Sequence, residues 1–163
     1  MKPKQLEKFV KPLYKKKDSM HNFKHILKIK RKIPYLKKDY KKINNDKLNF
    51  LTYFHGLKKF VNKNRKEILE LGYNREYIKT LNRHIKNPKT VEEKIVSDAN
   101  SLESVGKFGI KKAFAVGKKQ KRTKKETIIF IKRNIKKIKF YTKKGKTLGN
   151  KGIKVIERYL NKF

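Results

Sequence analysis

The chain has 163 residues, which is enough for one domain that buries roughly 70% of the surface its unfolded chain would expose. It contains no cysteine, which excludes disulfides and thiolate metal sites, and no apolar run long enough to cross a bilayer or serve as a signal peptide. Its 49 basic and 13 acidic residues give a formal net charge of +36. We therefore expect a single cytoplasmic domain over residues 1–163 that does not enter a membrane.

The positive charge has two interpretations. One is a surface for nucleic acid, because basic faces bind phosphate backbones with release of counterions. The other is coding bias, because seven of the 49 basic residues are arginine and the remaining 42 are lysine, as an AT-rich genome favours. Lysines occur in nearly every segment of the chain, so we favour coding bias and expect only weak, non-specific nucleic-acid binding.

In the first half of the chain, apolar residues recur at the spacing of one helical face. Pro12 would kink or end the first helix. Asp18 or Ser19 can cap the second, and Asn45 or Asp46 can start the third. The predicted helical segments are 4–17, 18–36, 46–63 and 75–88.

All four histidines of the chain fall on these segments. His21 and His25 are four residues apart on the second helix, which is the spacing of a metal-ligand pair. His55 lies inside the third helix beside Gly56, and His84 lies near the end of the fourth. Taken one at a time, such histidines more often pack and donate to backbone than bind metal, so both alternatives stay open.

The second half of the chain is also helical in pattern. A helix that Thr90 and Glu93 start as a capping box ends at Gly106, and a short helix over 108–116 follows. The apolar spacing of segment 118–163 predicts two amphipathic helices. Its glycines lack the spacing of a phosphate-binding loop. Because no alternating run appears, we expect an all-α, single-domain bundle of about six to eight helices.

The stretch DANSLESVGKFGIKKAF, which begins at Asp98, resembles the D-A-D-x-L-(E/D)-x-x-G-x-x-G-I-x-R-A-F signature of the HD superfamily of metal-dependent phosphohydrolases. His21 and His25 are similar to the family's opening H-D-x-x-H, and His55 and His84 fall where the family also carries histidine. The resemblance covers a core of about 18–117, while the C-terminal helices, 123–163, agree only in being helical.

The resemblance implies a metal site whose ligands are His25, His55 and Asp98. It places His21, His84 and Lys112 in supporting positions around the substrate. The ion would be divalent, one of Mn, Fe, Ni, Co, Zn or Mg, because imidazoles and carboxylates suit such ions.

The chain departs from the family's pattern at positions that include Gly56, Asn100 and Lys112. Gly56 replaces the aspartate of the His-Asp pair, which removes one ligand, while Asn100 and Lys112 replace an aspartate and an arginine of the signature. Our first hypothesis is an HD-type phosphohydrolase acting on a nucleotide or another small phosphate ester, with weakened metal binding. The alternatives are a catalytically inactive HD-fold protein and a basic nucleic-acid-associated protein, and the sequence carries no signal for the oligomeric state.

Overall fold

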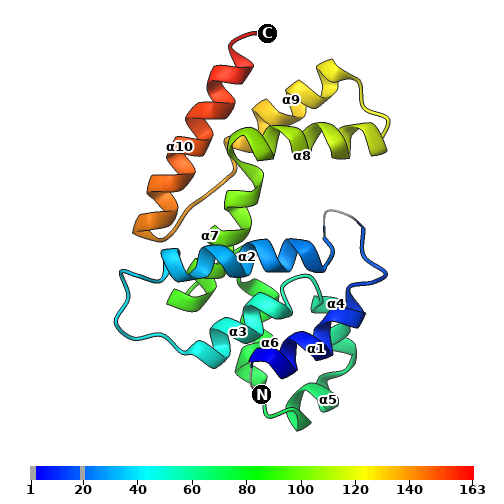
Figure 1. The fold of residues 1–163 in the computed structure, drawn as a ribbon, viewed down its shortest axis with the longest axis vertical. Coiled ribbons are helices and arrows are strands. Elements are labelled where there is room, and N and C mark those ends of the chain that lie inside the picture. Colours follow the sequence, from blue (N-terminus) through cyan, green and yellow to red (C-terminus); the bar gives the residue numbers. More distant parts are fainter. Residues whose placement is uncertain (1–2, 19–20) are drawn as a thin grey trace. The chain divides into compact units, whose positions relative to one another are not determined.

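Helices account for every regular element in the part of the chain that the computed structural model describes, residues 3–18 and 21–163. These residues form ten α-helices and one short 3₁₀ helix, without strands (Figure 1). The expected all-α class is confirmed, although helices are more numerous than predicted. The reason is that the predicted third helix is broken in two and an unpredicted helix, α5, follows it.

The chain divides into two compact units, Met1–Ser97 and Asp98–Phe163. In the first unit, α3 packs against α1, α2 and α6, and α4 packs against α6. None of the helices in the described chain combines the length and apolar character that a bilayer crossing requires. The helices of the first unit are α1 (Pro3–Leu13), α2 (Phe23–Leu36), α3 (Asn45–Tyr53), α4 (Lys58–Lys63), α5 (Arg65–Glu70) and α6 (Arg75–Arg83), and α7 (Val91–Ser101) begins in this unit.

Asparagine side chains start three of these helices. Asn22, Asn44 and Asn74 accept hydrogen bonds from backbone N–H groups in the first turns of α2, α3 and α6. The caps therefore differ from those expected for the second and third helices. Asp18 instead accepts from the backbone N–H of His21, and Ser19 lies outside the described residues.

The start of α7 is held by a buried carboxylate. Glu93 accepts a hydrogen bond from the N–H of Thr90, as expected, and also from the N–H of Lys89. Its other oxygen lies 2.6 Å from Nη2 of Arg83, at the end of α6. Because Glu93 is fully buried, this ion pair fixes the end of α6 against the start of α7.

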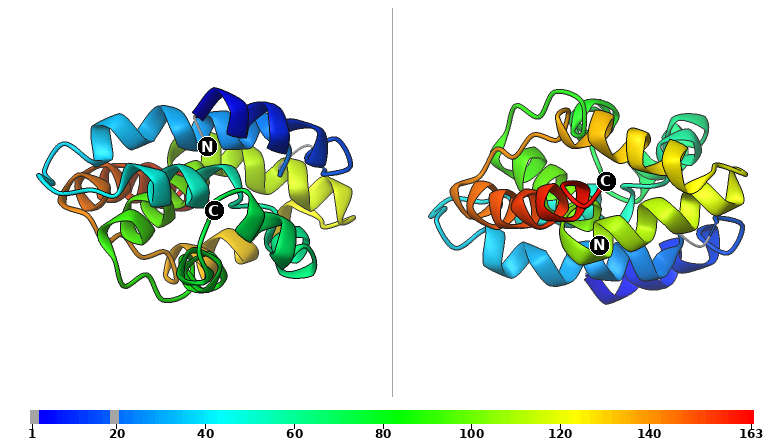
Figure 2. Two further views of the ribbon diagram at one scale, coloured as in Figure 1. Left: turned by 90° about the horizontal axis from the view of Figure 1, so that it is seen from below. Right: turned by 90° about the horizontal axis from the view of Figure 1, so that it is seen from above.

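The second unit contains the end of α7, a 3₁₀ turn (Leu102–Ser104) and helices α8 (Gly106–Lys119), α9 (Lys124–Ile135) and α10 (Lys143–Leu160). Helix α8 packs against both α9 and α10 (Figure 2). The core between them is aliphatic. Its buried members are Val105, Ile128, Ile131, Ile156 and Leu160.

The glycines Gly145 and Gly149 lie inside α10. A Cβ at Gly149 would collide with the ring of Phe140, and a Cβ at Gly145 would collide with Asp98 Oδ2 and Thr142 Oγ1. Neighbouring atoms approach the backbone too closely at these positions for a side chain to fit. Avoiding that clash outweighs the low helix propensity of glycine.

Candidate functional site

The first unit places three histidines at the ends of different elements. His25 lies in the first turn of α2, and His84 is the C-cap residue of α6. His55 and Gly56 lie in the turn between α3 and α4, not inside a helix as predicted. The helix ends there because the N–H of Leu57 donates to the carbonyl of Phe54 at 2.8 Å, which closes a turn.

These histidines form a row. The ring centroids of His25 and His55 are 5.8 Å apart, and those of His55 and His84 are 5.1 Å apart. Nδ1 of His55 lies 2.9 Å from Nε2 of His84, so the two rings share a hydrogen bond. The structure thus brings together residues that are 29 and 30 positions apart in the sequence.

The hydrogen bonds of this row assign its tautomers. Nδ1 of His84 lies 2.7 Å from the carbonyl oxygen of Leu81, which can only accept, so this nitrogen carries the proton. Nε2 of neutral His84 must then accept, and Nδ1–H of His55 donates to it. The lone pair of His55 is therefore on Nε2. An imidazole whose other nitrogen donates to a fixed acceptor is the usual form of a histidine metal ligand.

Burial keeps His84 neutral. Its side chain is fully buried, and desolvation lowers its pKa from the ordinary 6.5 to about 4. Because the ring is uncharged at neutral pH, its Nε2 stays an acceptor for His55. His84 thus orients His55, and its predicted supporting position around the substrate stays a prediction.

Gly56 is covered by a tyrosine. A Cβ at this position would lie 3.0 Å from Cε1 and 3.3 Å from Oη of Tyr14. The Tyr14 hydroxyl accepts a hydrogen bond from the N–H of Gly56 at 3.1 Å and donates one to the carbonyl of Tyr53 at 2.8 Å. The ring therefore fills part of the space that an aspartate side chain would need. Helical spacing could not predict this contact, because Tyr14 follows the end of α1 and lies 42 residues from Gly56.

Asp98 belongs to the second unit, where its carboxylate holds the start of α10. Oδ1 accepts from the N–H of Tyr141 at 2.9 Å, and Oδ2 accepts from the N–H and the hydroxyl of Thr142 at 2.8 and 2.7 Å. Burial raises the pKa of Asp98, and these hydrogen bonds oppose that shift. They occupy three of the roughly four acceptor positions of a carboxylate.

His21 and Lys112, the two remaining predicted residues, are less enclosed. His21 is exposed, and its Nδ1 pairs with Asp18 at 2.8 Å, while its ring lies 6.3 Å from that of His25. Lys112 is half-buried on α8 of the second unit. Their part in substrate binding stays a prediction.

The described histidines and carboxylates bring together fewer donors than a divalent ion usually has. Within residues 3–18 and 21–163, no group of three or more histidine, aspartate and glutamate side chains is arranged to hold a metal ion. The first unit supplies two neighbouring imidazoles, His25 and His55, whereas protein sites usually provide at least three ligands. These residues fit an ion that is held weakly. The convergence of His25, His55 and Asp98 stays a prediction.

Solved structures with the same fold were found for nearly the whole chain. An HD-superfamily hydrolase from Bacillus thuringiensis has a TM-score of 0.76 at 21% identity, covering 99% of this chain and 94% of that one. The Lin1889 protein from Listeria innocua has a TM-score of 0.74 at 20% identity, with 99% and 94% coverage. YpgQ from Bacillus subtilis, in complex with ADP, has a TM-score of 0.74 at 16% identity, with 98% and 92% coverage.

The chain therefore has the fold of the HD superfamily, as the signature-like stretch predicted. No protein-family model and no curated protein matches the sequence. At these identities the likeness defines the fold alone.

Proposed function

We propose that the protein is a metal-dependent phosphohydrolase of the HD type that acts on a nucleotide or another small phosphate ester. Its divalent ion would be held weakly by His25, His55 and Asp98. The observation that carries the proposal is the pair of hydrogen bonds that links His55 to His84 and His84 to the carbonyl of Leu81. These bonds leave the lone pair of His55 on Nε2, where it can bind a metal ion. The ADP bound to YpgQ, a protein of the same fold, supports a nucleotide as the substrate class.

The chemistry follows from these residues. When bound, a divalent ion lowers the pKa of its water and offsets the charge of a phosphoryl group. His25 and His55 provide neutral nitrogen donors, and His84 keeps the His55 ring in one orientation. Lysines around the chain attract the phosphate anion, because the net charge of +36 gives the protein a strongly positive field.

The test combines elemental analysis with hydrolysis of a panel of nucleoside phosphates. We expect Mn²⁺-dependent turnover that His25→Ala and His55→Ala each lower by about a hundredfold or more, because loss of an outer-shell partner alone costs about 10–100-fold. Lys24→Ala, at an exposed residue next to His25 on α2, is the control and should keep full activity. Turnover that survives both histidine substitutions would disprove the proposed site.

A second candidate function is an HD-fold protein that binds its ligand without hydrolysing it. The contact between Gly56 and Tyr14 favours this alternative, because it replaces a ligand with a packed aromatic ring. Saturable ADP binding without phosphate release, at millimolar Mn²⁺ and with each nucleotide of the panel, would establish it in place of the first.

A further inference from the structure

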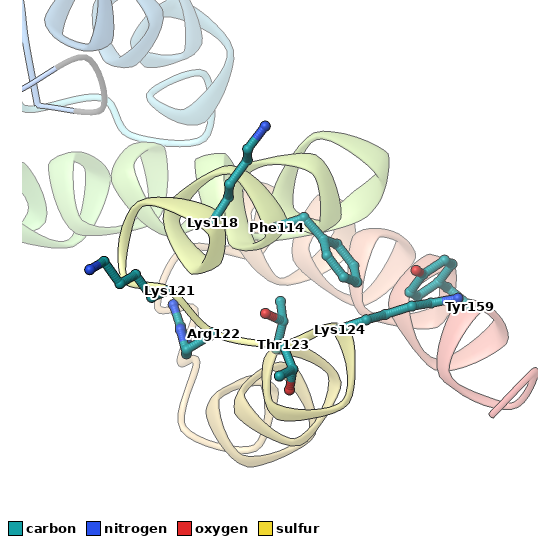
Figure 3. Close-up of a pocket in the computed structure, with 8 residues that line it drawn as sticks. Phe114, Lys118, Lys121, Arg122, Thr123, Lys124 and Tyr159 are labelled. Carbon is teal, nitrogen blue, oxygen red and sulfur yellow. The ribbon is translucent and has the colours of Figure 1, made fainter.

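The second unit contains a cavity, open to solvent at its surface, that the proposed reaction does not use. It lies where the end of α8, the start of α9 and the end of α10 meet, and its volume is about 760 Å³ (Figure 3). This is within the range of sites that hold small organic ligands, roughly 300–1,000 Å³. Its lining residues are Phe114, Lys118, Lys121, Arg122, Thr123, Lys124, Thr127 and Tyr159.

The segment that supplies most of the lining of this cavity contains basic but no acidic residues. Between Glu103 and Glu126 the sequence contains no acidic residue. The carboxylate of Glu126 is already engaged, since it accepts hydrogen bonds from the N–H and hydroxyl of Thr123 in the capping box of α9. The basic residues in this interval are Lys107, Lys111, Lys112, Lys118, Lys119, Lys121, Arg122, Lys124 and Lys125.

Arg122, which lines the cavity, has two hydrogen-bond donors without a partner in the described part of the chain. Its Nε and Nη2 atoms are buried and have no hydrogen-bond partner among the described residues. Its guanidinium carbon lies 4.0 Å from the ring centroid of Phe130, so the group is held against an aromatic face. Buried donors without acceptors are costly, and a ligand oxygen would remove that cost.

Aromatic rings form the other side of the cavity. The rings of Phe114 and Tyr159 meet edge to face, with centroids 6.2 Å apart. Figure 3 shows Lys124 extending towards Tyr159, while Lys118 and Lys121 point outwards at the rim. The site therefore combines an aromatic wall with the cationic side chains that line the rest of the cavity.

We propose that this cavity binds a nucleotide, with phosphate oxygens on Arg122 and the rim lysines and the base against Phe114 and Tyr159. Phosphate groups satisfy guanidinium donors in pairs, and bases stack on aromatic rings regardless of sequence. Lysine-rich composition alone would place charge here, but it would not line one cavity with two aromatic rings and an arginine that has two unpaired donors. The proposal is independent of hydrolysis, because the histidine row consists of other residues in the first unit.

Titration of ¹⁵N-labelled full-length protein with ADP, at about 150 mM salt, tests the proposal by NMR. We expect saturable shifts of the amide signals of Gly117, in the last turn of α8, and of Thr123, the N-cap of α9. The same shifts should occur in His55→Ala. Pyrophosphate should bind about tenfold more weakly than ADP, since it lacks the base. Equal binding of pyrophosphate and ADP would disprove the role of the rings.

Charge-matched double variants separate a built site from the general field of the protein. Lys118→Gln with Lys121→Gln removes two charges at the rim, and Lys136→Gln with Lys137→Gln removes two exposed charges near the end of α9. We expect the first pair to weaken ADP binding at the turn by about tenfold and the second to leave it nearly unchanged. Equal losses would overturn the proposal, because they would mean that net charge alone attracts the anion.

A short oligonucleotide tests whether the nucleotide is free or part of a strand. Arg122→Gln should weaken either ligand, with folding checked by the unchanged dispersion of core methyl signals. If the oligonucleotide shifts the same amides at lower concentration than ADP does, the natural ligand is a strand. If Arg122→Gln folds and binds ADP as the wild-type protein does, the assignment of Arg122 is wrong.

Discussion

The effect of Gly56→Asp on stability and on metal binding should depend on Tyr14. A Cβ at Gly56 would lie 3.0 Å from Cε1 of Tyr14, closer than a normal carbon–carbon contact, so Gly56→Asp must displace the ring. Overpacking of this kind costs about 1–3 kcal/mol of the free energy of unfolding. Tyr14→Leu removes the ring atoms that the new side chain would meet, although it also loses two hydrogen bonds made by the hydroxyl.

The assay is a double-mutant cycle by urea unfolding, combined with calorimetric titration of Mn²⁺. We expect Gly56→Asp to cost at least about 1 kcal/mol less in the Tyr14→Leu background than in the wild-type background. Metal binding should rise in Gly56→Asp and rise further in the double variant, because the carboxylate then reaches its position without strain. Gly56→Asn, which is equally large but uncharged, is the matched control and should gain little metal.

Two results would refute this reasoning. An equal cost of Gly56→Asp in both backgrounds would mean that the Tyr14 ring does not limit the space at position 56. Equal Mn²⁺ binding by the aspartate and asparagine variants would mean that a carboxylate at this position does not act as a ligand, and the inactive alternative would then replace the phosphohydrolase.

Three further predictions concern stability and charge. His84→Gln should flatten the pH dependence of the free energy of unfolding. The pKa of His84 is about 4 in the folded protein and 6.5 in the unfolded chain, so its contribution to stability is fully present above pH 6.5. In the wild-type protein that contribution falls by about 3 kcal/mol towards pH 4. A variant as pH-sensitive as the wild-type protein would contradict the burial of a neutral His84. Asp98→Asn should lose about 1–3 kcal/mol in urea unfolding, because an amide offers Tyr141 and Thr142 one acceptor oxygen in place of two, whereas Asn150→Ala, at an exposed residue of α10, should change little. Binding to duplex and single-stranded nucleic acid should be weak, similar for both forms and steeply reduced by salt, and tight binding at near-physiological salt that survives heparin would instead show a dedicated surface.

The helical architecture could be predicted from the sequence because it depends on local regularities. Apolar residues at three-and-four spacing define the buried face of a helix wherever it packs. The reach of Glu93 back to Thr90 was also predictable, since both partners lie within one helical turn. The order of the four histidines and the signature-like stretch at Asp98 pointed to the HD fold before any contact was known.

Only the tertiary structure decided which side chains meet. Tyr14 and Gly56 are 42 residues apart, and Asp98 and Thr142 are 44 apart. The hydrogen bond that sets the His55 tautomer spans 29 residues, and the cavity beside Arg122 needs Phe114 and Tyr159 from different helices. Periodicity specifies which face of a helix is buried but not which helix covers it, because that choice depends on the shapes and packing of all the helices together.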